Sequence, residues 1–294
     1  MLKFFLLIAG EIILLPVLYI KEFLKRYIDI PEREVKEREP VKSDRVVVGI
    51  HDWAGYGLKR KKTVNDIEFD CGLDCQLQRI ANYKGSRKLD LSLTISDYDE
   101  VKYGSKYQGL NFTPVSNIGM DFQGYAYTIF DNINEDNCYI LLMNSSVDAA
   151  QVNFLDEYIN FLEQNPQVGL LGISYSAKMY QTIIRNNFTP HVQSFFLLST
   201  LSVFKEVIAY NGGKFPGRNI EHKRLLIRFG EIALSHIISK LGYNLAIITE
   251  QNKPYIFPKT KGWFNTARSQ WTLPLGEYRF HVKHPNRINN IKSN

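Results

Sequence analysis

The sequence predicts an α/β fold with a mostly parallel, Rossmann-like sheet flanked by helices. Six apolar runs rich in β-branched residues alternate with helical patterns, which is typical of such a sheet. The runs lie at 45–50, 89–96, 139–143, 168–174, 192–199 and 245–249. The chain has 294 residues, of which 45% are hydrophobic and 13% aromatic, enough for a sizeable core. These values exclude disordered, collagen-like and disulfide-scaffold classes.

The first run, RVVVGI at 45–50, is continuously apolar and predicts a strand buried on both faces. The clearest helical pattern spans 149–164, with Asp148 as its predicted cap and Pro166 as its stop. A second helix is expected from about residue 220 to 241, because Gly242 follows it at the position of a left-handed cap.

Ahead of this body, residues 1–28 contain an apolar stretch at 4–20 that Glu11 and Pro16 interrupt. It predicts a membrane anchor or an interfacial helix, since 17 residues barely cover a hydrocarbon core of about 30 Å. A buried first helix is the alternative. Lys and Arg are more frequent after this stretch than before it, which predicts that the body of the chain lies on the cytoplasmic face of a membrane. Residues 29–44 are highly charged and predict a linker, either a tether or a short exposed helix.

The net charge of +6 is concentrated at the end of the chain. Residues 251–294 carry eight Lys or Arg side chains against Glu277 alone. Such a basic segment suits either closing a phosphate-binding site or resting on an anionic membrane; an ordinary solvated surface is the alternative. Nucleic acid is not an expected partner, because no dense basic run with interleaved aromatic residues occurs.

Three cysteines, Cys71, Cys75 and Cys138, are too few for a disulfide framework and lack the second ligand pair of a zinc site. The chain also lacks the glycine patterns of dinucleotide-binding and P-loop folds and the serine elbow of hydrolases.

Polar residues follow several of the predicted strands, and the carboxyl ends of parallel strands are where ligands bind. After the first strand come His51-Asp52-Trp53 and then the basic run at 59–62; Asn144, Ser145, Ser146 and Asp148 follow the third strand. Between them lies Asn117-x-Gly119-x-Asp121, and the segment 190–196 reads PHVQSFF. Each alone is also ordinary turn chemistry.

Taken in order, these segments resemble GT-A-type glycosyltransferases of bacterial surface polysaccharide and lipopolysaccharide synthesis, especially the rhamnan-synthesis-like group. The likeness covers roughly residues 45–250, which would form one GT-A-like domain, with 251–294 as a separate basic segment.

The resemblance implies a nucleotide-diphosphate sugar as substrate. Its donor-binding residues would be His51, Asp52, Asn117, Gly119, Asp121, Asn144, Ser145 and Ser146. Gly119 would let the backbone approach the ligand. The triplet 144–146 stands where many such enzymes have an Asp-x-Asp pair for Mg²⁺ or Mn²⁺, so the metal requirement is open. Either Asp148 or Asp121 supplies the charge, or basic side chains such as Lys259, Lys261 and Arg268 replace the metal.

By the same resemblance Glu231 would be the general base of an inverting transfer, with Glu221 as the runner-up. The alternative is an exposed helix carboxylate near Arg228 or Ser235. His191, Gln193 and Ser194 would contact the acceptor or the donor sugar. Trp53, Trp263 and Trp271 are candidates for stacking on sugar rings.

The function implied is a hexosyl- or deoxyhexosyltransferase that acts on a glycan or lipid-linked acceptor at a membrane surface of the bacterial envelope. The competing hypothesis is a non-catalytic, membrane-tethered interaction protein that keeps the fold.

Overall fold

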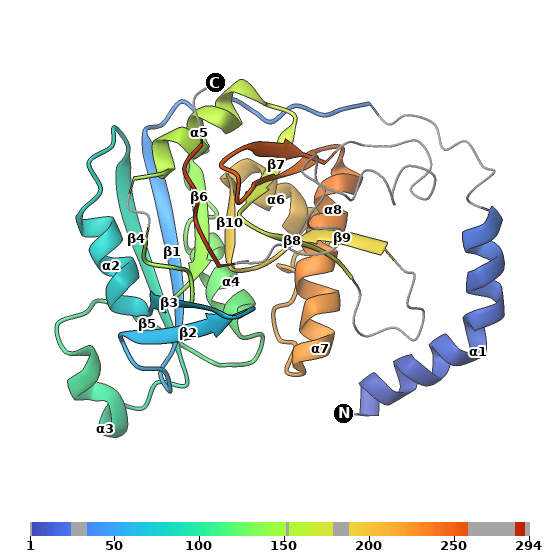
Figure 1. The fold of residues 1–294 in the computed structure, drawn as a ribbon, viewed down its shortest axis with the longest axis horizontal. Helices are drawn as coiled ribbons and strands as arrows, with labels where there is room; N and C mark the ends of the chain where they lie inside the picture. The colour runs from blue at the N-terminus through green and yellow to red at the C-terminus, as the bar shows by residue number, and fades with distance from the viewer. Residues whose placement is uncertain (1, 25–33, 151–152, 179–187, 258–285, 292–294) are drawn as a thin grey trace.

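A computed structural model describes residues 2–24, 34–150, 153–178, 188–257 and 286–291 (Figure 1). An eight-stranded sheet forms its centre, and six of these strands are parallel. From edge to edge the order is β12 (Pro254–Ile256), β11 (Asn244–Ile248), β7 (Val168–Gly172), β10 (Phe196–Thr200), β6 (Tyr139–Asn144), β1 (Arg45–Trp53), β4 (Lys88–Ser96) and β5 (Thr113–Val115). Strands β10 and β12 run antiparallel to the others. The predicted α/β class with a mostly parallel sheet is confirmed.

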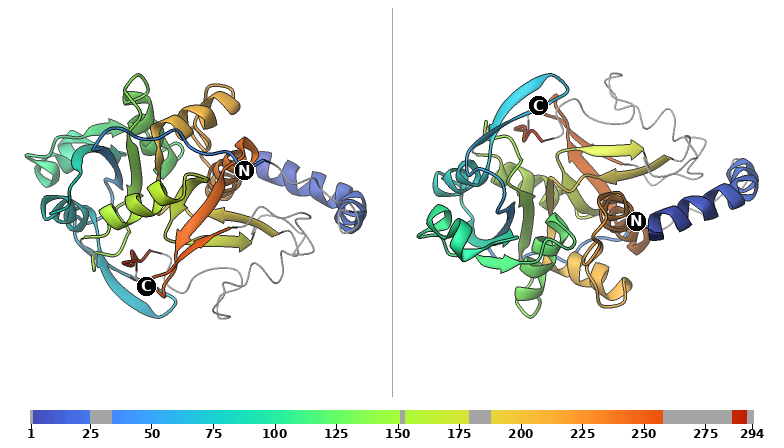
Figure 2. Two further views of the ribbon diagram at one scale, coloured as in Figure 1. Left: turned by 90° about the horizontal axis from the view of Figure 1, so that it is seen from above. Right: turned by 90° about the horizontal axis from the view of Figure 1, so that it is seen from below.

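Both faces of this sheet are covered, as the continuous apolar strands require. One core contains side chains of α4 (Asp121–Asp131), α6 (Leu201–Tyr210) and α8 (Ala233–Leu241). The other contains those of α2 (Leu73–Ala81) and α5 (Leu155–Gln164). Green α4 and gold α6 lie on one side of the strands in Figure 2. Strand β1 serves both cores, with Val47 in the first and Val46 and Val48 in the second.

The remaining elements are short. Two small antiparallel sheets pair β2 (Arg60–Val64) with β3 (Ile67–Cys71), and β8 (Tyr175–Lys178) with β9 (Phe188–Val192). Helix α3 (Glu100–Tyr103) continues into a 3₁₀ turn, η1 (Gly104–Tyr107). Helix α7 (Lys223–Leu226) leads through a π-helical segment, η2 (Ile227–Ile232), into α8.

Two predicted element boundaries are wrong. The helix expected at 149–164 begins only at Leu155, and Asp148 instead accepts a hydrogen bond from Ala150 N at 2.7 Å, forming a turn. The strand expected at 192–199 is divided: Val192 ends β9 of the small β8–β9 sheet, 193–195 are in no strand, and β10 of the main sheet begins at Phe196. The predicted end of the last helix is confirmed, since Gly242 has φ +110°.

Residues 34–44 contain no helix or strand and lie against the body. Arg38 is buried and donates to the carbonyl oxygens of Val168, at 2.5 Å, and Leu162. Its backbone N–H bonds Pro166 O at 2.8 Å. This part of the predicted linker is therefore docked rather than a free tether.

The apolar stretch at the start of the chain forms α1 (Leu2–Leu24), with Pro16 inside it. Across the residues that the structure describes, none of the helices combines the length and apolarity needed to cross a membrane.

Candidate functional site

The sheet has a topological switch point between β1 and β6. From β1 the chain moves outward to β4 and β5, then returns to the other side of β1 as β6. In open α/β sheets ligands bind outside the carboxyl ends of the strands at such a point. His51 of β1 is in register with Asn144 of β6, so the polar ends predicted from the sequence do meet at one edge.

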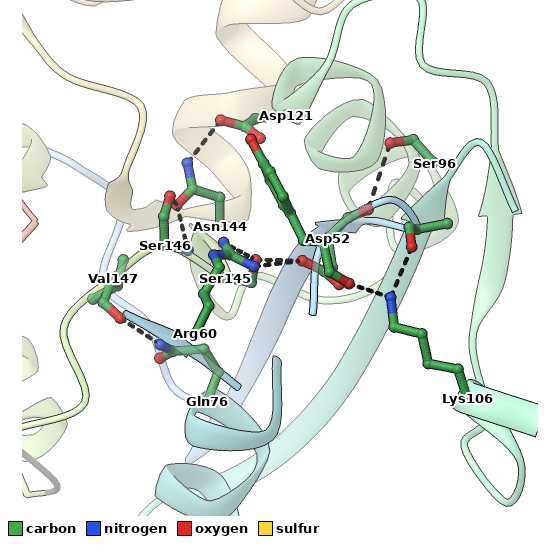
Figure 3. Close-up of polar contacts among 12 residues, drawn as sticks. Asp52, Arg60, Gln76, Ser96, Lys106, Asp121, Asn144, Ser145, Ser146 and Val147 are labelled. Carbon is green, nitrogen blue, oxygen red and sulfur yellow. Dashed lines mark hydrogen bonds and ion pairs between the residues drawn. The ribbon is translucent and has the colours of Figure 1, made fainter. Parts of the chain in front are cut away.

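Asp52 has a fully buried side chain at this edge, and its contacts are drawn in Figure 3. Its Oδ1 accepts a hydrogen bond from Ser145 Oγ and lies 3.6 Å from Arg60 Nη1. Its Oδ2 accepts from the hydroxyl of buried Tyr107 at 3.3 Å. Arg60 also donates from Nη2 to Ser145 Oγ at 2.9 Å. A buried carboxylate needs such partners, and here β2, the turn after β6 and η1 supply them.

Asp121 and Asn144 form a second group beside the first. Asn144 donates from Nδ2 to Asp121 Oδ2 at 2.8 Å, and its Oδ1 accepts from Ser146 N at 3.1 Å and Ser146 Oγ at 2.7 Å. Asp121 is the first residue of α4, where the positive end of the helix dipole favours a carboxylate. These contacts fix the Asn144 amide between Asp121 and Ser146.

His51 lies inside the protein rather than at the surface of this edge. Because side chains alternate along a strand, His51 points to the face opposite Asp52 and is 2% exposed. Its Nδ1 is 3.0 Å from Thr94 Oγ1, and a Cβ added at Gly124 of α4 would lie only 2.3 Å from this nitrogen. Burial lowers the pKa of His51 despite the opposing charges of Asp121 and Asp52. The structure thus places His51 on the α4 side of β1, and its contact with a nucleotide stays a prediction.

Asn117 follows β5 and contacts Asp97 instead of Asp121. Its Nδ2 donates to Asp97 Oδ2 at 2.8 Å, and Ser96 Oγ donates to its Oδ1 at 3.3 Å. Trp53 Nε1 donates to the same Asp97 oxygen at 2.7 Å. Asp97 directly follows the strand expected at 89–96. Its position at a strand end was therefore a signal in the sequence that could have identified it as a candidate site residue.

Gly119 lies in the turn before α4, where another backbone segment approaches it closely. Its φ is +93°, and a Cβ there would lie 3.2 Å from Asn219 N and from Gly217 O. The glycine therefore lets the turn before α4 pack against the backbone at 217–219. Its close approach to a ligand stays a prediction.

A third polar group lies around Glu231 in η2. Glu231 Oε1 accepts from Ser194 N at 3.1 Å and Ser194 Oγ at 2.7 Å, and its Oε2 lies 3.7 Å from His191 Nε2. Tyr125 of α4 donates to Ser194 O at 2.7 Å. Residues of β9 and of the segment between β9 and β10 thus hold the Glu231 carboxylate. These contacts do not fit the alternative, in which Glu231 is an exposed helix carboxylate near Arg228 or Ser235.

The Glu231 group and the Asp121 group are linked through α4 and through Phe195. Tyr125 follows Asp121 by one helical turn, and burial, with the charges of Asp121 and Glu231, raises its pKa. Phe195 O accepts from Asn144 N at 3.3 Å, one residue after Ser194. Gln193 is half-buried, its N–H donating to Ser174 O at 3.1 Å. Glu221, the runner-up base, is exposed before α7.

The residues present do not fit a divalent cation at this edge. Both Asp52 oxygens face internal donors, and Asn144 Oδ1 is occupied by Ser146. Asp148 is 7% exposed, accepts from Ala150, and its carbonyl accepts from Arg79. Throughout the described part of the chain, no group of three or more His, Cys, Asp or Glu side chains could hold a metal ion. Cys71, Cys75 and Cys138 are free thiols.

Residues 286–291 return to the loop after β6, drawn in red in Figure 1. Asn286 O accepts from Asp148 N at 2.9 Å, and its Nδ2 donates to Ser146 O at 2.9 Å. Ile288 is buried in the second core. The end of the basic segment therefore contacts the candidate site, while Lys259, Lys261, Arg268, Trp263 and Trp271 lie outside the described residues.

Comparison with known proteins gives little guidance. No protein-family model and no curated protein matches the chain. Among solved structures, it is similar to the mannosyltransferase PcManGT from Pyrobaculum calidifontis in complex with GDP-Man and Mn²⁺, at 13% identity and a TM-score of 0.40. The match covers 91% of this chain and 72% of that one. At this similarity, conclusions about function depend on the residues of the site.

Proposed function

We propose that this protein is a glycosyltransferase that moves a sugar from a nucleotide-diphosphate donor onto a glycan or lipid-linked acceptor of the bacterial surface. The observation that carries the proposal is the convergence of Asp52, Asp121, Asn144 and Ser145 at the switch point of the sheet. Glu231 lies in the polar group that Tyr125 and Phe195 connect to them. The motif resemblance at the same residues supports a nucleotide-sugar ligand over other anions.

In this proposal Glu231 is the general base. Its carboxylate takes the proton of the acceptor hydroxyl while the acceptor oxygen attacks the anomeric carbon. The bond from that carbon to the diphosphate oxygen breaks, and the diphosphate leaves with the electron pair, inverting the anomeric centre. Ser194 and His191 hold the carboxylate in one orientation before the acceptor arrives.

The donor is tested by thermal shift and calorimetry of the full chain with ADP, GDP, UDP, CDP and dTDP, each with and without Mn²⁺. A raised Tm with one of them supports a donor site at this edge, because a ligand that binds only the folded state stabilises it. If none of these nucleotides raises the Tm, the non-catalytic interaction protein is favoured. The enclosed position of Asp52 also suits that alternative, because a buried carboxylate can serve structure alone.

The base is tested by Glu231→Gln, which keeps the shape of the side chain and removes its proton affinity. We expect turnover to fall by roughly 10²-fold or more, with nucleotide affinity nearly unchanged. Glu221→Gln is the matched control and should retain the wild-type rate. A Glu231→Gln variant as active as the wild type would remove Glu231 from this role.

Membrane association is part of the proposal. Helix α1 exposes Phe5, Ile13, Val17 and Ile20 by more than half, as an interfacial helix would before contact with lipid. Flotation with anionic vesicles should recover the wild-type chain and lose an Ile13→Glu, Val17→Glu variant. Equal recovery of the two would refute attachment through α1.

A further inference from the structure

The β2–β3 hairpin places two cationic side chains over the carboxyl edge of the sheet. Arg60 and Lys62 are two residues apart in β2, so they project from the same face of the strand, and both are partly buried. Lys61 and Thr63 project from the opposite face and are exposed. Strand β2 thus directs Arg60 and Lys62 toward the protein and Lys61 toward solvent.

Arg60 keeps unused hydrogen-bonding capacity at the edge (Figure 3). Its Nη2 donates to Ser145 Oγ, but its buried Nη1 makes no hydrogen bond and lies 3.6 Å from Asp52 Oδ1. The guanidinium stacks on the Tyr56 ring, with 4.1 Å from Cζ to the ring centroid. Stacking and the ion pair hold the fork in place, while the buried Nη1 makes no hydrogen bond of its own.

The ammonium of Lys62 has fewer polar contacts than the guanidinium of Arg60. Its ammonium lies 5.5 Å from the centre of the Phe195 ring, and within the described residues it has no hydrogen bond or ion pair. Burial lowers the pKa of Lys62, and the positive charges of Arg60 and Lys223 act in the same direction, while Cys71 and Asp121 oppose them. A half-buried cation without an acceptor is unfavourable in the ligand-free protein, and an anion bound at this edge would relieve that cost.

Lys61 shows that this arrangement is particular to Lys62. The Lys61 ammonium pairs with Glu68 of β3 at 2.9 Å in an exposed position. Neither acid of the edge forms an ion pair with Lys62 in the described structure: Asp52 is enclosed, and Asp121 acts on Lys62 only through its charge while one of its oxygens accepts from Asn144.

Resting on the proposed function, we propose that Arg60 and Lys62 bind the diphosphate of the nucleotide donor. They would supply the positive charge that a divalent ion supplies in enzymes with an Asp-x-Asp pair. The oxygen atoms at this edge do not fit such an ion. Arg60 would contact the diphosphate as a fixed fork and Lys62 as a point charge. The leaving diphosphate would keep both contacts as its negative charge develops.

The test compares calorimetric binding of nucleoside diphosphates, the corresponding nucleosides and inorganic pyrophosphate to the full chain, with either EDTA or Mn²⁺ present. We expect nucleoside diphosphate and pyrophosphate to bind in EDTA. Lys62→Gln should weaken both by about tenfold, since charge-assisted hydrogen bonds to phosphate are strong, and leave nucleoside affinity unchanged. Lys61→Gln, the matched control, should bind like the wild type.

Arg60→Lys should also weaken diphosphate binding, because the charge stays but the fork is lost. Arg60 supports Asp52, so each variant is first checked for a wild-type unfolding transition; Lys62→Gln lacks this complication.

The inference is overturned if diphosphate binding disappears in EDTA, or if Lys62→Gln and Lys61→Gln bind pyrophosphate and nucleoside diphosphate equally well. Failure of the proposed function looks different. In that case neither nucleosides nor nucleoside diphosphates bind under any condition.

Discussion

Asp52 and Asp121 lie at the same edge of the sheet, yet their surroundings differ. Asp52 has a fully buried side chain with Ser145, Tyr107 and Arg60 around its two oxygens. Asp121 is partly exposed and accepts from Asn144 through one oxygen. A carboxylate already satisfied on both oxygens holds structure together, whereas one with a spare oxygen can meet a ligand. Of the two acids, Asp121 is therefore the better candidate for donor contact.

Removing each carboxylate in turn should give the largest difference in stability between the two sites. We expect Asp52→Ala to lower the free energy of unfolding by about 3 kcal/mol, because Arg60 keeps a buried charge without its partner. Asp121→Ala should cost less than about 1 kcal/mol, since a partly exposed pair is lost. Urea unfolding of both variants measures the difference. Equal losses would contradict the distinction between an enclosed acid and an available one.

The serines that follow Asn144 provide a finer comparison. Ser145→Ala removes the hydroxyl that joins Asp52 to Arg60 and should cost about 1–2 kcal/mol, because the charged partners are buried. Ser146→Ala should cost about 0.5–1 kcal/mol, since the Ser146 N–H still bonds Asn144 Oδ1. Urea unfolding again measures both. A larger loss for Ser146→Ala would indicate that the hydrogen bonds around Asn144 and Asp121 stabilise the fold more than those around Asp52.

His51, on the opposite face of β1, should produce the smallest effect, visible only as a pH dependence. Burial lowers its pKa in the folded chain, whereas the unfolded chain protonates it near its ordinary value of 6.5. Its contribution to stability is therefore complete above pH 6.5 and is lost as the pH falls toward the folded-state pKa. Unfolding of His51→Asn should depend less on pH across this interval than that of the wild type. If His51→Asn keeps the wild-type pH dependence, burial of the His51 ring does not couple stability to pH.

The parts of the fold that the sequence predicted are those fixed by local composition. The β-branched run of β1 required burial on both faces, and Gly242 ended the last helix through its left-handed backbone. The break between β9 and β10 was not predictable in this way. Its Ser194 N–H bonds the distant Glu231 carboxylate instead of a neighbouring strand, and no local pattern records that contact.

The β2–β3 hairpin was missed although its signal is local. Strand β2 reads RKKTV, in which hydrophobic alternation is weak, whereas β3 reads IEFDC and alternates apolar with acidic residues over only five positions. The hairpin's two-residue turn, Asn65-Asp66, has positive φ at both residues, the geometry that Asn and Asp favour in tight hairpins. Recognising this turn would have placed Arg60 and Lys62 on one strand face. The direction of His51, by contrast, depended on which helix covers that face.

The contacts of Asn286 with the loop after β6 have a consequence for the order in which the protein is made. Two hydrogen bonds join residues about 140 positions apart in the chain, Asn286 to Ser146 and to Asp148. During synthesis, β1, β6 and the hairpin leave the ribosome long before Asn286 exists. The loop beside the proposed diphosphate site therefore gains this support only after every strand of the sheet has been synthesised, because Asn286 follows β12 in the chain.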